Sequence, residues 1–199
     1  MNDLITALIE AIYSFDHSVL LFIQENLRFN VITPLMKAVT FTVNKGVLWI
    51  LFGVVLLCFK KTRMVGAVVL SALAVGLLFN NVIVKNVVDR ARPYEAYPDV
   101  IPLVPMPKDS SFASGHTTAS FAAAATVIHF FRKPVCAVVI VYAVLVAVSR
   151  LYLGVHYPTD VLCGAMFGVL SSILVYYIYK KKFDLEPYRL KTHREEAAE

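Results

Sequence analysis

The sequence predicts an all-α fold, a polytopic bundle of about six transmembrane helices, on three observations. Hydrophobic residues make up 58% of the 199 residues, charged residues only 17%, and the mean hydropathy is +0.67. A soluble domain usually contains about 25% charged residues and fewer apolar ones. Because uncharged runs long enough to cross a bilayer recur between short charged segments, a membrane is the simplest solvent for this chain. The composition excludes an ordinary soluble domain and a disordered chain.

Five of the expected spans are clear in the sequence. Residues 64–84 are uncharged throughout and long enough to cross about 30 Å of hydrocarbon as a helix. Four other apolar runs follow the same pattern, at residues 41–59, 115–131, 134–149 and 161–179. We therefore expect a membrane-embedded core over residues 41–179.

Two segments flank this core. The first has apolar residues at helical spacing, which predicts an amphipathic helix on the membrane surface: Leu4, Leu8, Ala11, Ile12 and Phe15. Residues 31–40 could instead belong to a sixth span, so residues 1–40 are either an amphipathic or a first membrane segment. Residues 180–199 are charged and carry no motif, and we expect them to form a solvated cytoplasmic tail.

The basic residues predict the orientation in the membrane. They collect in three segments that alternate spans would place on one face: Lys60, Lys61 and Arg63; Arg132 and Lys133; Lys180, Lys181 and Lys182. By the positive-inside rule this face and the C-terminus are cytoplasmic. The outer face receives residues 93–113, which hold five of the nine prolines and form a connector or a lid. We expect a multi-pass protein of a bacterial plasma membrane, whose net charge of +5 reflects topology and not a nucleic-acid partner.

Three groups of polar residues fall on the outer face at the ends of spans. In the first group, Lys85 and Arg92 are seven positions apart, which on a helix places them on one face, where they could hold one anion. The alternative is that they anchor the helix at the interface, although positive charge is ordinarily depleted on the outer side. Pro93 is expected to end this helix and to fix the direction of the Arg92 guanidinium.

The second group is Ser114, Gly115 and His116, which precede an alanine-rich run. A hydroxyl, backbone N–H groups and the positive end of a helix dipole are the usual materials of a phosphate site. Ser114 is equally an ordinary N-cap. The group alone leaves both interpretations open.

The third group is Arg150, His156 and Asp160, which meet where one span ends and the next begins. Asp160 either complements the helix dipole or holds His156 in one tautomer, as a carboxylate does for a catalytic imidazole. His17 and His129 lack such neighbours, and we expect both to be structural or interfacial.

Together the three groups resemble the signature of the type 2 phosphatidic acid phosphatase family, which includes glucose-6-phosphatase and the vanadium haloperoxidases. Residues 85–93 match a lysine, six residues and Arg-Pro; residues 149–160 match Ser-Arg, five residues, His, three residues and Asp. Residues 114–116 match Ser-Gly-His, and Ala113 stands where the family has proline. The resemblance covers about residues 41–179. It implies a helical bundle and a phosphatase mechanism without metal or cofactor.

The resemblance also implies a role for each matched residue. His156 would attack phosphorus to form a phosphohistidine, Asp160 would support it, and His116 would protonate the leaving oxygen and later activate water. The phosphoryl oxygens would be held by Lys85, Arg92, Ser114, the Gly115 N–H and Arg150. Fixed cations and N–H donors also suit the charge of a transferring phosphoryl group on chemical grounds.

These observations predict an integral membrane lipid phosphatase that acts on a lipid phosphate at the outer surface, in contact with membrane lipids. Undecaprenyl diphosphate is the first choice of substrate, and phosphatidic acid or phosphatidylglycerophosphate is the alternative. A transporter also places charged residues in membrane helices, but here they gather at one face. An inactive lipid-binding relative usually lacks a nucleophile or an acid, and both His156 and His116 are present. The sequence leaves the oligomeric state open.

Overall fold

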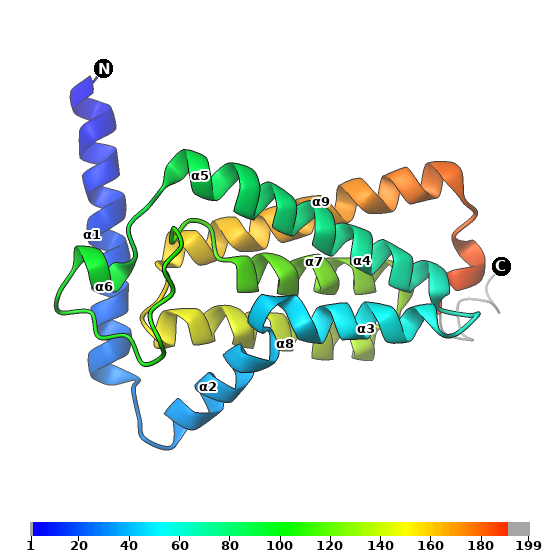
Figure 1. Ribbon diagram of the computed structural model, residues 1–199, viewed down its shortest axis with the longest axis horizontal. Coiled ribbons are helices and arrows are strands. Elements are labelled where there is room, and N and C mark those ends of the chain that lie inside the picture. The colour runs from blue at the N-terminus through cyan, green and yellow to red at the C-terminus, as the bar shows by residue number, and fades with distance from the viewer. Residues whose placement is uncertain (1, 191–199) are drawn as a thin grey trace.

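The computed structural model describes residues 2–190, and over this range the only regular elements are helices. Met1 and residues 191–199, which end the expected tail, lie outside it. Most of the bundle helices match the expected spans, so the all-α prediction is confirmed. Five helices run side by side (Figure 1): α3 (Val47–Leu57), α4 (Arg63–Leu78), α7 (Gly115–Phe130), α8 (Lys133–Tyr152) and α9 (Pro158–Lys182).

The first of these helices continues a bent pair. α2 (Ile32–Thr42) meets α3 at an angle of 42° across a short 3₁₀ turn, η1 (Asn44–Gly46). Lys45 and Gly46 in that turn have φ angles of 52° and 75°, which glycine adopts without strain and lysine rarely. The apolar segment expected to span residues 41–59 therefore starts earlier, at Ile32, and it is broken at η1 into two helices.

α4 continues without a loop through a π-helical turn, η2 (Phe79–Val84), and a last turn, α5 (Lys85–Val88). Turns of this kind often lie at functional sites. Asn80 is fully buried in η2 and donates from Nδ2 to the carbonyl oxygen of Ala113 at 3.0 Å. This bond ties the end of α4 to the residues that precede α7.

α7 and α9 approach closely because small residues lie between them. A Cβ atom on Gly168 would lie 2.4 Å from the carbonyl oxygen of Thr118, and one on Gly164 would lie 2.7 Å from that of Ser114. Small residues let membrane helices come together in this way. The Ser114 N–H donates to the Asp160 carbonyl oxygen at 3.1 Å, so the first turns of the two helices are held side by side.

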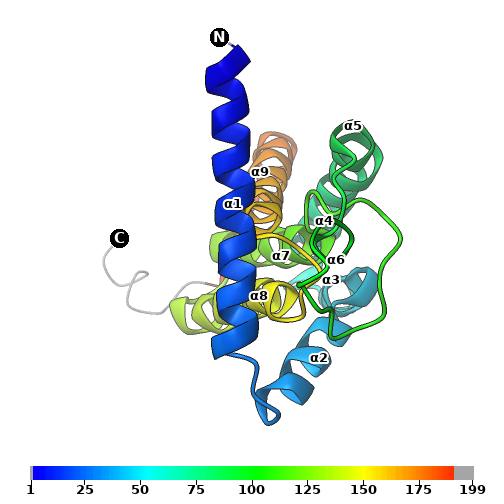
Figure 2. The ribbon, with the colours of Figure 1, turned by 90° about the vertical axis from the view of Figure 1, so that its left-hand side faces the viewer.

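α1 (Asn2–Asn26) runs crosswise to the bundle and lies over one of its ends (Figures 1 and 2). Much of its apolar surface is exposed, whereas Asp16 and Leu20 are buried where α1 contacts the bundle. By length and composition alone, four helices of the described chain could cross a membrane, α1 among them, or five if α2 and α3 count as one. α1 differs from the other candidate spans because it runs across the bundle and not along it (Figure 1).

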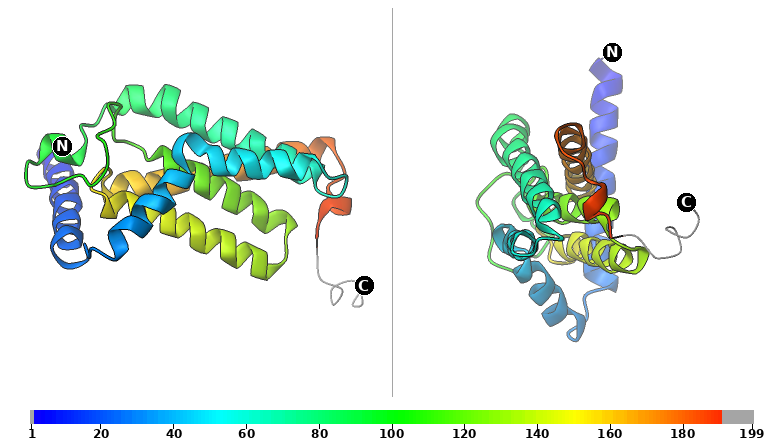
Figure 3. Two further views of the ribbon diagram at one scale, coloured as in Figure 1. Left: turned by 60° about the horizontal axis from the view of Figure 1, so that its bottom comes forward. Right: turned by 90° about the vertical axis from the view of Figure 1, so that its right-hand side faces the viewer.

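The opposite end of the bundle is covered by the residues that follow α9 (Figure 3). Leu185 is only 4% exposed there, and the N–H of Leu190 donates to the carbonyl oxygen of Phe130 at 2.6 Å. Within the described part of the expected tail, Leu185 is therefore packed against the bundle, whereas Lys180, Lys181, Lys182, Phe183 and Asp184 stay exposed.

Candidate active site

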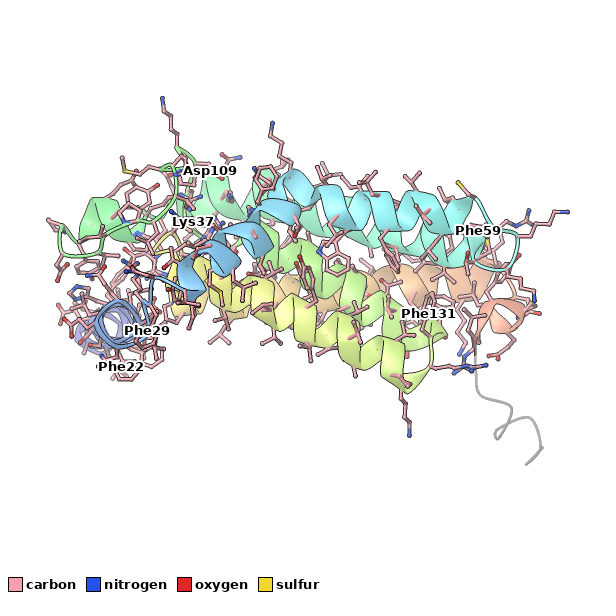
Figure 4. The ribbon with its side chains drawn as sticks, turned by 90° about the horizontal axis from the view of Figure 1, so that it is seen from below. Phe22, Phe29, Lys37, Phe59, Asp109 and Phe131 are labelled. Carbon is pink, nitrogen blue, oxygen red and sulfur yellow. The ribbon has the colours of Figure 1, made fainter. Side chains whose placement is uncertain are left out.

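A cavity of about 860 Å³ opens at the α1 end of the bundle. Its apolar wall includes Phe41, Leu77, Leu103 and Val104. Side chains at this end include Lys37 and Asp109, whereas Phe59 and Phe131 mark the far end (Figure 4). All three groups singled out in the sequence contribute to its lining: Lys85, Arg92, Gly115, His116, Arg150 and His156.

Lys85 and Arg92 meet in a way that helix periodicity does not explain. The helix ends at Val88, because Asp89 adopts a left-handed φ of 40°, and Pro93 begins the short helix α6 (Pro93–Ala96) instead of ending a longer one. The prediction of one continuous helical face is therefore wrong. The two cations are brought together by a carboxylate that belongs to the following loop.

That carboxylate is Asp109. Lys85 forms an ion pair with its Oδ2, and Arg92 donates from Nη2 to Oδ1 at 2.7 Å and from Nε to the Asp109 carbonyl at 2.8 Å. Partial burial would by itself raise the pKa of Asp109, but the hydrogen bond and charge of Lys85, together with Arg92, lower it to about 2. Asp109 is therefore ionised at neutral pH, and two cations of the cavity hold a carboxylate.

Ser114 does not line the cavity, which differs from its expected role as a phosphate ligand. Its side chain is fully buried and its Oγ caps the start of α7, accepting from the hydroxyl of Thr117 at 3.0 Å. Gly115 and His116 follow on the first turn of α7 and do line the cavity. The N-cap interpretation of Ser114 thus holds, and the next two residues reach the site.

His156 lies between the cavity and Asp160. Its Nδ1 is 3.4 Å from Asp160 Oδ2, and its Nε2 is 3.4 Å from Nη1 of Arg92. Asp160 is fully buried, and its Oδ2 also accepts from Ser111 Oγ at 2.5 Å and from the Tyr157 N–H at 2.9 Å. These contacts fix the carboxylate behind the imidazole.

The imidazole of His156 is neutral at neutral pH. Burial lowers its pKa to about 4, the Asp160 carboxylate opposes this shift, and the positive charges of Arg150 and Arg92 add to it. A neutral ring with Nδ1 toward Asp160 leaves the lone pair of Nε2 toward the cavity. This is the protonation state that a nucleophilic imidazole needs.

Arg150 is buried with little to neutralise it. It is 4% exposed and donates from Nη1 to the hydroxyl of Thr40 on α2 at 2.5 Å, and its Nε has no hydrogen-bond partner. No carboxylate of residues 2–190 forms an ion pair with it. A buried guanidinium with free donors beside a cavity is suited to an anionic ligand.

The two other histidines of the described residues, His17 and His129, lie outside the cavity. His17 pairs with Asp99 at 3.0 Å, and His129 stacks on Tyr176 with ring centroids 3.9 Å apart.

The sequence groups miss several polar residues of this region. They are Asp16, Lys37, Lys45, Arg90, Asp109 and Ser111. One signal was available for Asp16, which interrupts the apolar pattern of α1.

Comparison with known proteins identifies the family. Residues 62–184, more than half of the chain, match the sequence profile of the PAP2 superfamily. The chain belongs to this superfamily. An undecaprenyl-diphosphatase of Sulfolobus acidocaldarius is 34% identical over 126 residues, which cover 63% of this chain and 61% of that protein. Phosphatidylglycerophosphatase B of Bacillus subtilis is 33% identical over 136 residues, 63% of each chain.

A solved structure shares the fold. The transmembrane PAP2-type phosphatidylglycerolphosphate phosphatase of Bacillus subtilis aligns with a TM-score of 0.71 and 28% identity, over 88% of this chain and 90% of that one. The chain is therefore a multi-pass membrane protein of the PAP2 superfamily. It spans about three fifths of the length of the two curated relatives named above.

The side chains at the cavity do not resemble a metal site. Within the described residues, no group of three or more His, Cys, Asp or Glu side chains could hold a metal ion. The cavity instead collects lysine and arginine, whose positive charge would repel a divalent cation. Metal independence remains a prediction for experiment.

Proposed function

We propose that this protein is a lipid phosphatase that removes phosphate from a lipid headgroup through a phosphohistidine. The observation that carries this proposal is the neutral imidazole of His156, which faces a cavity lined by lysine and arginine side chains and has a fixed carboxylate behind it. A nucleophile, a group that orients it and several cations for the phosphoryl oxygens are what phosphoryl transfer through a covalent intermediate requires.

The reaction would take place in two steps. Nε2 of His156 attacks phosphorus, the bond from phosphorus to the leaving oxygen breaks, and His116 gives that oxygen a proton. Asp160 stabilises the positive charge that develops on the imidazole. His116 then takes a proton from water, whose oxygen attacks phosphorus and breaks the P–N bond, which releases inorganic phosphate and restores His156.

The cations of the cavity would bind the phosphoryl oxygens in both steps. Lys85, Arg92 and Arg150, with the Gly115 N–H, supply positive charge and donors where charge develops in the transition state. Asp109 must first release Lys85 and Arg92, because its carboxylate pairs with both. The loop that carries Asp109 would therefore move as substrate binds.

A lipid diphosphate is the substrate class that we favour. Lys37 and Lys45 also line the cavity, and neither forms an ion pair with a residue between positions 2 and 190. Two more cations suit a second phosphate group, which phosphatidic acid lacks. The Sulfolobus acidocaldarius relative named undecaprenyl-diphosphatase supports the same choice, and the Bacillus subtilis phosphatidylglycerophosphatase B supports the alternative.

The site would face the outer side of the cell membrane. The basic residues at the far end of the bundle favour a cytoplasmic location for that end. α1, which lies across this end of the bundle (Figure 1), would then run along the outer surface with its exposed apolar residues in the lipid. A lipid headgroup can reach the cavity from the adjacent leaflet, while its chains stay in the membrane.

A substrate panel on the purified protein tests this proposal. The protein in detergent should release phosphate from a prenyl diphosphate faster than from a prenyl monophosphate, phosphatidic acid or phosphatidylglycerophosphate, and vanadate should inhibit it. Replacing both Lys37 and Lys45 with glutamine should lower kcat/KM for the diphosphate by about tenfold and leave the monophosphate almost unaffected. Lys61→Gln, at the far end, is the matched control.

Failure to release phosphate from any of these lipids would contradict the proposal and favour a transporter or a lipid-binding protein. If substitution of the two lysines lowered kcat/KM equally for the diphosphate and the monophosphate, only the choice of a lipid diphosphate as substrate would be contradicted.

A further inference from the structure

Three buried side chains of alternating charge, Asp16, Arg90 and Asp160, form a row from α1 to the candidate nucleophile. Asp16 Oδ2 accepts from Arg90 Nη2 at 2.7 Å, and Arg90 Nη1 donates to Asp160 Oδ1 at 2.8 Å. Asp160 in turn faces His156 with its other oxygen. The row therefore begins on α1, passes through the segment after α5 and ends at the cavity.

The row is closely held along its length. Asp16 and Asp160 are fully buried, and the Arg90 guanidinium lies over the ring of Tyr157 at 3.8 Å. Asp16 also accepts from the N–H of Thr159 at 3.0 Å and from its hydroxyl at 2.5 Å, where α1 passes the start of α9 (Figure 2). Buried charges are tolerated when they are paired and hydrogen-bonded in this way.

Neither Asp16 nor Arg90 lines the cavity. The ion pairs of their side chains reach the candidate catalytic residues through Asp160. Arg90 alone would neutralise Asp160 and weaken its support for a positively charged imidazole. Asp16 offsets that charge, so Asp16, Arg90 and Asp160 together keep one net negative charge behind His156.

We infer that Asp16 and Arg90 are positioning residues for the nucleophile, which makes α1 part of the catalytic apparatus. They fix the direction of the Asp160 carboxylate and preserve its negative charge, and Asp160 then keeps Nε2 of His156 free to attack. The inference rests on the proposed phosphatase function. Asp16 lies outside residues 62–184, which match the superfamily profile, so this contribution comes from a part of the chain that the profile does not cover.

A docking role for α1 alone makes a different prediction. If the ion pairs served only to attach α1, kcat would fall in step with thermal stability, and breaking another contact of α1 would have the same effect. If they set the charge behind His156, kcat follows the charge of the row, so Arg90→Gln, which leaves two carboxylates together, loses more than the variant without both charges.

The test measures steady-state phosphate release for a charge-removal cycle. Asp16→Asn should lower kcat about tenfold with KM unchanged, because the lost group does not touch substrate. Arg90→Gln should lower kcat about 100-fold, since it leaves two unpaired carboxylates together. The variant that carries both substitutions should recover activity relative to Arg90→Gln alone. Asp16→Glu, which keeps the charge, should retain more activity than Asp16→Asn.

His17→Gln provides the matched control on the same helix. It breaks a neighbouring contact of α1, the ion pair with Asp99, and should leave kcat at the wild-type value. Thermal unfolding and gel filtration in detergent identify variants that fold. If Asp16→Asn does not fold, the double variant, which leaves one unpaired carboxylate in place of the two in Arg90→Gln, must show a lower kcat than wild type with an unchanged KM.

The outcomes separate this inference from the proposed function. Wild-type protein without phosphatase activity would overturn both. An active wild type with Asp16→Asn at wild-type kcat, or with a double variant less active than Arg90→Gln, would overturn the inference alone. Equal losses in His17→Gln and Asp16→Asn would assign the effect to docking of α1.

Discussion

Cations gather at both ends of the bundle, but the two ends treat them differently. At the α1 end, Arg92 and Arg150 are 2% and 4% exposed and point donors at a cavity. At the far end eight basic residues are exposed, and none of these eight forms an ion pair within the described chain: Lys60, Lys61, Arg63, Arg132, Lys133, Lys180, Lys181 and Lys182. Burying a cation is costly unless an anion pairs with it, so the buried arginines at the α1 end indicate an anionic ligand. The exposed cations at the far end indicate how the protein is oriented in the membrane.

The orientation of the two ends gives an all-or-none prediction. In a protein whose three cysteines, Cys58, Cys136 and Cys163, have been replaced, Asp109→Cys should react with an impermeant thiol reagent added to intact cells. Lys181→Cys should react only after permeabilisation, since the proposed orientation places the far end in the cytoplasm. The reverse pattern would place the cavity on the cytoplasmic side.

An arginine-to-lysine change at each end compares the two sets directly. Arg150→Lys should lower kcat/KM by about 100-fold, since an ammonium group cannot reproduce the donors of a guanidinium in the transition state. Arg132→Lys, on the exposed far end, should stay within about twofold of wild type. Similar losses in both variants would mean that burial does not distinguish the functional cations.

The contacts of Asp109 predict a smaller effect in the opposite direction. Its carboxylate occupies Lys85 and Arg92, so Asp109→Asn should lower the inhibition constant of inorganic phosphate several-fold. Since the pKa of Asp109 is about 2, lowering the pH from 7 to 5 should not relieve this competition in the wild type. Asp99→Asn, in the same loop, is the control, and weaker phosphate binding in Asp109→Asn would show that the carboxylate assists binding.

Chelation should have no effect. The cations of the α1 end supply the positive charge that Mg²⁺ provides in many phosphoryl-transfer sites. Phosphate release should therefore continue in excess EDTA at the rate measured without it. Loss of turnover that added Mg²⁺ restores would mean that a metal ion carries part of the reaction.

Much of the fold and of the site could be predicted from the sequence because the signals are local. The uncharged run of residues 64–84 and the short spacing from His156 to Asp160 each lie within one or two helices. The break at Lys45 was missed because hydropathy does not report a left-handed residue inside an apolar segment. The prediction that Lys85 and Arg92 share one helix face was wrong because the helix ends at Asp89, between the two residues.

The contacts that the sequence did not predict join distant segments. Asp16 and Arg90 are separated by 74 positions, and Arg150 and Thr40 by 110. No local pattern indicates which buried carboxylate will meet which guanidinium, since the packing of α1 across the bundle decides it. The contacts of Asp109 with Lys85 and Arg92 were missed for the same reason, because Asp109 lies in a loop without regular structure.

Trapping the covalent intermediate tests the central claim most directly. An activated aryl phosphate has a leaving oxygen that needs no proton. With this substrate, the His116→Ala variant should still become phosphorylated on His156 but should hydrolyse the phosphohistidine slowly. Mass spectrometry should then find one phosphoryl group on His156, stable to base and labile to acid, and none in a variant that also carries His156→Asn. Phosphate release by His116→Ala without any phosphoryl group on His156, or with the group on another residue, would contradict the account.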